Sequence, residues 1–135
     1  MQLSNLINLT FLSLVSSASQ SSPASVNANA DAFALAYRVD FYKDILHYGE
    51  KMPVTPSLFC TNLPAQYQNE ASSAHWEFSN PSDFEIRFFT ELDCKGEMRK
   101  WLGNTTYENQ PNNFVVDNIN DRVKSLRLWF LDNNN

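Results

Sequence analysis

The chain has 135 residues, which is room for one domain. Its formal net charge is −5 and it has no basic run, which argues against a nucleic-acid partner and against an anionic membrane surface. Aromatic residues make up 13% of the sequence, so we expect a small domain whose interior is filled largely by rings.

Residues 1–18 have the features of a secretory signal peptide. They carry no charge, and the apolar stretch Leu6–Val15 is followed by Ser16 and Ala18 at the positions that a signal peptidase prefers. The stretch is too short and too interrupted to span a membrane. The alternative is a buried N-terminal helix. We expect a secreted, extracellular protein, cleaved after Ala18 or a little later.

Residues 19–35 are predicted to form a disordered linker or a short pro-segment. The stretch Gln20–Ala30 is rich in Ser, Ala and Asn and has no aromatic residue, so it cannot bury enough apolar surface to become ordered. The predicted folded domain covers residues 36–132. A domain of this size has a small core for its surface and usually needs a further source of stability.

The two cysteines, Cys60 and Cys94, are a candidate for that stability. An even number of cysteines in a secreted chain favours a disulfide. Closing a loop of this length would stabilise the fold by about 3–4 kcal/mol. The alternative is a pair of free, buried thiols.

The folded part is predicted to be strand and turn throughout. Apolar and polar residues alternate over Tyr37–Phe41, which is typical of a half-buried strand, and again over Phe84–Phe88, 47 positions later. The final strand, Val123–Leu131, has a counterpart in Ala74–Phe78, 52 positions earlier. The growth of the offset predicts about five extra residues in the second copy, within the polar segment Gly103–Pro111.

Each copy also contains an aromatic residue seven positions before a glycine. Tyr42 precedes Gly49 and Phe89 precedes Gly96 at this spacing. A strand that turns back in a short hairpin needs a residue that tolerates positive φ, and glycine is that residue. One supersecondary unit is therefore predicted to occur twice, as motif 1 over residues 36–80 and motif 2 over residues 83–132.

These segments resemble the βγ-crystallin superfamily, whose domains are built from two Greek-key motifs. The resemblance is carried by Tyr42–Gly49, by Phe89–Gly96 and by the closing stretch Ile119–Leu128, and it extends over about 95 residues. It implies an all-β fold in which the two motifs form one sandwich. It also implies that a serine at the end of each motif, Ser73 and Ser125, ties down the folded hairpin by hydrogen bonding.

The resemblance further implies a calcium site, because microbial members often bind this ion in a loop with two Asn/Asp residues, two free positions, a Ser/Thr and a final Ser. The first loop fits, with Asn69, Glu70 and the ligand position Ser72, although Gln68 replaces the first Asn/Asp. The second has Lys124 where the hydroxyl belongs, and an ammonium group has no lone pair for a cation. Calcium is thus the one cofactor expected, at one loop. The alternative is that both loops are structural only.

No constellation indicates catalysis. His47 and His75 lack the spacing of zinc ligands and are expected to be plain surface or interface residues. Asp40 and Asp44 could form a carboxylate pair for glycoside hydrolysis, but acidic residues beside strands usually serve solvation. We expect a protein that is not an enzyme.

Two features bear on the surface. Asn104-Thr105-Thr106 is a glycosylation sequon, so Asn104 is predicted to carry a glycan, the alternative being an ordinary polar turn. Trp76, Trp101 and Trp129 either bind a carbohydrate or pack in the core, and core packing is the more common role.

The leading hypothesis is a secreted, non-enzymatic βγ-crystallin-like module of microbial, fungal-like type, stabilised by calcium at one loop. The alternative is a secreted inhibitor, killer-toxin-like protein or effector on the same fold, which would bind an unknown protein or glycan partner. In that case the segment 103–112 is the candidate binding loop.

Overall fold

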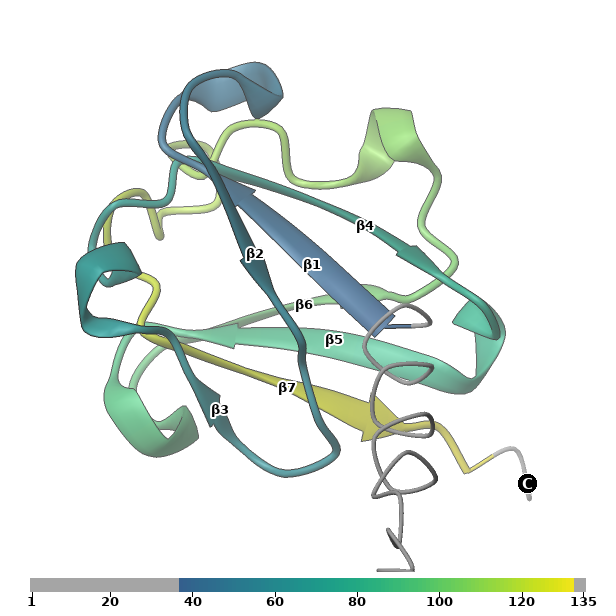
Figure 1. The fold of residues 1–135 in the computed structure, drawn as a ribbon. Coiled ribbons are helices and arrows are strands. Elements are labelled where there is room, and N and C mark those ends of the chain that lie inside the picture. The colour runs from purple at the N-terminus through teal and green to yellow at the C-terminus, as the bar shows by residue number, and fades with distance from the viewer. Residues whose placement is uncertain (1–36, 133–135) are drawn as a thin grey trace, which may run out of the picture.

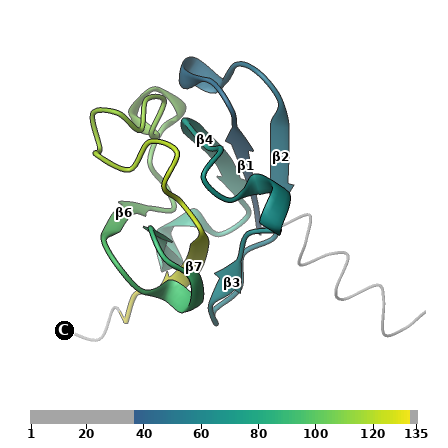
Figure 2. The same cartoon turned by 90° about the vertical axis from the view of Figure 1, so that its left-hand side faces the viewer.

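The computed structural model describes residues 37–132, which form two antiparallel β-sheets (Figure 1). The predicted signal peptide (residues 1–18) and the predicted linker (residues 19–35) lie outside the described residues. In the turned view, β1 and β2 lie on one side of the molecule and β6 and β7 on the other (Figure 2). Within residues 37–132 no helix is long and apolar enough to cross a membrane.

Seven strands and five short 3₁₀ turns make up the described chain. The strands of the first half are β1 (Tyr37–Tyr42), β2 (Lys51–Val54), β3 (Thr61–Asn62) and β4 (Ser73–Phe78), and those of the second half are β5 (Phe84–Phe89), β6 (Met98–Leu102) and β7 (Ser125–Phe130). The 3₁₀ turns are η1 (Ile45–His47), η2 (Ala65–Tyr67), η3 (Pro81–Asp83), η4 (Leu92–Cys94) and η5 (Tyr107–Asn109).

The strand order is that of two interlocked Greek keys. The first sheet has the order β2-β1-β4, and the second has the order β3-β7-β5-β6. The short strand β3 therefore leaves its own motif and pairs with β7 of the other, with Thr61 opposite Leu126. Because of this crossing, the second sheet contains a strand from the first half of the chain.

The first sheet lacks the reciprocal strand. In its place, Pro111 accepts a hydrogen bond from the Ala74 amide at 2.9 Å, and Gln110 lies beside β4. The Gln110 side chain accepts from the Trp76 amide at 3.0 Å and donates to the Trp76 carbonyl at 2.9 Å. One side-chain amide thus satisfies the edge of β4 as a strand would. The predicted insertion within Gly103–Pro111 is the segment that ends here.

The core lies between the two sheets and is rich in aromatic rings. Phe41 of β1 and Phe88 of β5 occupy equivalent positions of the repeat, and their ring centroids are 5.1 Å apart. Phe114 packs within 6.5 Å of Phe41 and 5.9 Å of Phe88, while Trp76 meets Phe88 edge-on. Burial of such rings is the main stabilising contribution in a domain this small.

The two hairpins have the same backbone conformation. Gly49 and Gly96 adopt φ values of +79° and +80°, in the left-handed region. A Cβ atom added at Gly49 would lie 2.5 Å from an oxygen of Asp44, and one at Gly96 would lie 2.6 Å from the hydroxyl of Thr90. Both the φ angle and the space therefore require glycine.

A disulfide joins Cys60 to Cys94, with a Cα–Cα distance of 5.7 Å. It connects the residue before β3 to the η4 turn in the second hairpin. The expected pairing of the two cysteines is therefore present, and it links the two motifs covalently next to the crossing strand.

Candidate functional site

The closing serines hold the hairpins in equivalent ways. The buried Ser73 hydroxyl donates to the Asp44 carbonyl at 2.7 Å and accepts from the His47 amide at 3.1 Å. Ser125 donates to the Glu91 carbonyl at 2.6 Å and accepts from the Cys94 amide at 3.0 Å. Each serine satisfies two backbone groups at the bend of its own hairpin.

The two loops in front of these serines pair with each other. The amide of Asn69 donates to Val123 O at 3.4 Å, and the amide of Asp121 donates to Ala71 O at 3.0 Å. Asn69 and Asp121 occupy equivalent positions and both have left-handed φ, 60° and 53°. The loops therefore cross at a point of local twofold symmetry.

This crossing brings the Ser72 side chain to Asp121. The Ser72 hydroxyl and the Asp121 carboxylate are 3.4 Å apart. The neighbouring Asn120 donates from its amide nitrogen to the other carboxylate oxygen of Asp121 at 2.8 Å, and its own Oδ1 is buried with no hydrogen-bond partner in the described chain. Hydroxyl, carboxylate and amide oxygens are the ligands that a hard divalent cation prefers.

The other predicted loop residues lie differently. Glu70 turns toward the first hairpin, where its carboxylate is 3.6 Å from the ammonium group of Lys43. Lys43 also donates to the Glu50 carboxylate at 2.9 Å, and this hydrogen bond is the main reason that the pKa of Lys43 is raised. Asn69 contributes its backbone to the loop pairing. The structure thus brings Ser72 together with Asp121, and it places Glu70 in an ion-pair network.

In the second motif a positively charged side chain, that of Arg122, links the loop to the hairpin. Arg122 forms a two-pronged contact with the Glu97 carboxylate, with N–O distances of 2.9 and 3.3 Å. The hydrogen bonds that Arg122 donates to Glu97 lower the pKa of Glu97 and raise that of Arg122. Both side chains are exposed, so the pair contributes little to stability.

Sequence reasoning missed Asp121 as the partner of Ser72. When each loop is considered separately, Asp121 belongs to the second loop, in which Lys124 replaces the hydroxyl ligand. The pairing of Ser72 with Asp121 follows only from the twofold crossing of the loops, which brings together residues 49 positions apart. The internal repeat was the available signal, because it predicts that equivalent loops meet at a common axis.

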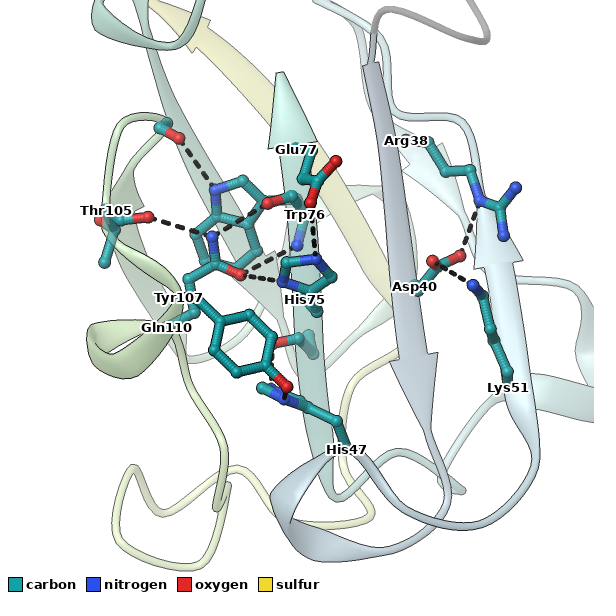
Figure 3. A network of polar contacts seen from close by, with 12 residues as sticks. Arg38, Asp40, His47, Lys51, His75, Trp76, Glu77, Thr105, Tyr107 and Gln110 are labelled. Carbon is teal, nitrogen blue, oxygen red and sulfur yellow. Dashed lines mark hydrogen bonds and ion pairs between the residues drawn. The ribbon is translucent and has the colours of Figure 1, made fainter.

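The two histidines, expected to be plain surface or interface residues, form one network with the inserted segment (Figure 3). His47 lies 3.0 Å from both the Tyr107 hydroxyl and the Ala74 carbonyl, and His75 lies 2.7 Å from the Gln110 side-chain oxygen. A carbonyl only accepts, so His47 Nε2 carries a hydrogen and Nδ1 accepts from Tyr107. His75 likewise donates from Nδ1, because Gln110 Oε1 already accepts from a backbone amide.

The remaining surface candidates are placed as follows. Asn104 is exposed beside a turn closed by the Thr105 amide and the Leu102 carbonyl at 3.0 Å. Trp76 is in the core and Trp101 packs against it, whereas Trp129 is 40% exposed on the outer face of β7. Within residues 37–132 no three His, Cys, Asp or Glu side chains are grouped to hold a metal ion.

No family model matches the chain, and no curated protein matches it by sequence. Solved structures do match. A βγ-crystallin domain described in work on the evolution of the eye-lens fold aligns with a TM-score of 0.53 at 16% identity, over 70% of this chain and 87% of that one. A βγ-crystallin from Ciona intestinalis aligns at 0.51 and 14% identity, over 68% and 99%.

A third match is a βγ-crystallin domain of the Abundant Perithecial Protein of Neurospora crassa, solved in its Ca²⁺-bound form. It has a TM-score of 0.50 and 11% identity, over 73% of this chain and 93% of that one. At such identities the likeness concerns the fold, and it agrees with the two sheets, the crossing strand and the paired hairpins described above. The chain has the fold of a single βγ-crystallin domain.

Proposed function

We propose that the protein is a secreted, non-enzymatic βγ-crystallin-like module that is stabilised by one calcium ion bound between Ser72 and Asp121. The observation that carries the proposal is the set of oxygen ligands at the loop crossing. Ser72 and Asp121 face each other, and the amide oxygen of Asn120 next to them is buried without a partner. A cation that reached that oxygen would offset the cost of its burial.

Such an ion would bridge the two motifs, since Ser72 belongs to the first and Asp121 to the second. The Ca²⁺-bound form of the Neurospora crassa domain supports the choice of ion. With one carboxylate among the proposed ligands, we expect weak binding, in the range of about 10⁻⁴–10⁻³ M that is common for extracellular modules. The ion would then act as a stabiliser of a durable fold.

Secretion is supported by the disulfide, because such bonds persist mainly in oxidising compartments. It also follows from the predicted signal peptide over residues 1–18. N-terminal sequencing of the protein recovered from the culture medium of an expressing cell tests this part. The expected mature N-terminus lies at Ser19 or a few residues later.

The calcium site is tested by thermal unfolding of the mature domain with 0–10 mM CaCl₂. A ligand that binds only the folded state must stabilise it, by about 1.4–2.7 kcal/mol when it is present at 10 to 100 times its Kd. We expect the melting temperature to rise with calcium in the wild type and to stay constant in Asp121→Asn. Glu108→Gln, an exposed charge change in the inserted segment, is the matched control and keeps the full response.

An equal rise with magnesium, or an unchanged rise in Asp121→Asn, would show that the effect comes from elsewhere on this acidic surface. No rise at 10 mM calcium would remove the ion from the proposal and leave a purely structural module.

A further inference from the structure

The internal repeat allows the outer faces of the two sheets to be compared position by position. In the first sheet, Asp40 lies opposite His75 and Arg38 lies opposite Glu77. In the second sheet, the equivalent pairs are Arg87 opposite Arg127 and Glu85 opposite Trp129. Since the backbone is the same, the fold does not require the basic and aromatic residues of the second sheet.

The Arg87–Arg127 pair is unfavourable by itself. Like charges directly opposite each other on neighbouring strands destabilise a sheet. Both guanidinium groups lie over the Trp129 ring, with Cζ atoms 4.0 and 4.7 Å from its centroid. Of nearby carboxylates, Glu85 is bound by Arg87 at 2.7 Å and by Lys100 at 3.0 Å, which leaves Arg127 without that counter-charge.

An apolar pocket of about 390 Å³ adjoins this face. Leu58, Trp129, Phe130 and Leu131 contribute most of its lining, with Arg127 and Asp132 beside them. Phe130 is 58% exposed, and Phe59, next to Leu58 in the chain, is 81% exposed. Phe59 adjoins the pocket through Leu58 and does not itself line it. Exposed large apolar side chains around a pocket mark an interaction site more often than an ordinary solvated surface.

The loop that presents Phe59 is held in place on several sides. Ser57 accepts a hydrogen bond from the Phe59 amide at 3.2 Å and donates to the Phe59 carbonyl at 2.9 Å. The Ser57 carbonyl accepts from the Leu128 amide, the Leu58 carbonyl accepts from Arg127, and the next residue is the disulfide-bonded Cys60. Because the backbone of this loop is held, ordering it costs little conformational entropy on binding.

From these observations we infer that Phe59, the Trp129 pocket and the guanidinium groups of Arg87 and Arg127 form a docking surface for an acidic protein segment. That segment presents a large apolar side chain to the pocket, and flanking carboxylates to the two arginines. A neutral sugar is disfavoured, because it would need to stack on an uncovered face of the Trp129 ring, and the two guanidinium groups lie over that ring. Charge disfavours a second copy docked through its first-sheet face, where Arg38 and Lys51 lie around Asp40.

The test uses a random twelve-residue peptide library displayed on phage, selected against the purified mature protein. We expect enriched peptides that combine an aromatic or large aliphatic residue with at least two Asp or Glu. Synthetic versions should bind at least tenfold more weakly to Phe59→Ser and to Arg127→Gln. They should also bind more weakly at 0.5 M NaCl than at 0.05 M, because the charge contacts are screened.

Tyr48→Ser is the matched control, since the Tyr48 side chain is 68% exposed and lies on the hairpin between β1 and β2. It should retain full affinity, and thermal melting checks that all three variants are folded. The inference is overturned by selected peptides without acidic residues, or by equal binding of Phe59→Ser and wild type. It is also overturned if the wild type is a dimer in sedimentation equilibrium and Phe59→Ser is a monomer. Binding of an acidic polysaccharide with equal affinity to the wild type and to Phe59→Ser would overturn it as well. None of these readouts depends on calcium, so the calcium site can fail separately.

Discussion

At the scale of single residues, left-handed backbone conformations occur in equivalent pairs. Leu46 and His47 in the first hairpin match Asp93 and Cys94 in the second, and all four have φ between 55° and 61°. Such conformations cost free energy for residues other than glycine. Their recurrence at equivalent positions shows that they belong to the hairpin design. The sequence predicted the glycines, but Leu and Cys carry no local preference for this conformation, and the preference of His and Asp is too weak to have revealed these positions.

Ser73→Ala is expected to lower the free energy of unfolding by about 1–3 kcal/mol. The substitution leaves the Asp44 carbonyl and the His47 amide without their partner at a fully buried position. Urea unfolding followed by tryptophan fluorescence measures the change. Ser82→Ala, at an exposed serine that contacts only Asp83 in its η3 turn, should change stability by less than 0.5 kcal/mol (about the usual range for surface changes). Equal effects of the two variants would contradict the assigned role of Ser73.

At the scale of elements, the disulfide and the short strand β3 act together. Cys60 directly precedes β3, whose two residues pair with β7, and the hydrogen bonds of Asn62 to Asp93 hold the same hairpin at 2.8 and 3.0 Å. A strand of two residues supplies few ladder bonds, so the covalent link carries much of the connection between the motifs.

The double variant Cys60→Ser/Cys94→Ser is therefore expected to lose about 3–4 kcal/mol of stability, as for the loss of a loop closure of 34 residues. Urea unfolding measures the loss, and the wild type treated with dithiothreitol should reach the same value. If the reduced wild type kept its full stability, the link would have no role in holding β3.

The histidine network gives a pH dependence. Burial lowers the pKa of His47 below its ordinary 6.5, the charge of His75 lowers it further, and the Ala74 carbonyl partly opposes this. Other groups around the pair are Asp40, Tyr42 and Glu77 on the strands and Tyr107 on η5. Unfolded His47 binds a proton at higher pH than the folded form, so stability falls as the pH drops below about 6.5.

We expect the free energy of unfolding of the wild type to be lower at pH 5.5 than at pH 7.5. In His47→Asn this difference should be smaller, because asparagine does not titrate and tolerates the left-handed φ of 61° at this position. Urea unfolding at the two pH values measures both. An unchanged difference in His47→Asn would assign the pH dependence to other groups.

At the scale of elements, the sequence did not predict that the first sheet lacks the strand reciprocal to β3. Offsets of 47 and 52 predict an insertion in the second copy, and the sequence pattern predicts β1, β4, β5 and β7. It does not predict β6, the strand that directly precedes the insertion. That Gln110 would replace a strand at the edge of β4 was not predictable, because the replacement uses side-chain hydrogen bonds to Trp76. Strand patterns carry no trace of such a contact.

At the scale of the whole molecule, one twofold arrangement explains both what matches and what differs between the halves. The hairpins, closing serines and core rings obey it, since they are needed for one shared core. The outer faces and loop ligands depart from it, since solvent-facing positions are free to differ. Departures from internal symmetry therefore identify the residues on which function is proposed, Ser72 with Asp121 and Trp129 with its arginines.

The same symmetry predicts how a second calcium site could be made. The counterparts of Ser72 and Asp121 are Lys124 and Asn69, which place a positive charge and an uncharged amide where the first site has a hydroxyl and a carboxylate. In Asn69→Asp/Lys124→Ser the second crossing position gains a carboxylate in place of the amide and a hydroxyl in place of the ammonium group. Isothermal titration should then show two calcium ions per chain, where one is expected for the wild type. Asn69→Asp alone, which keeps Lys124, is the matched control and should remain at one. A stoichiometry of one in the double variant would mean that the loops are not equivalent as ligands, although their backbones are.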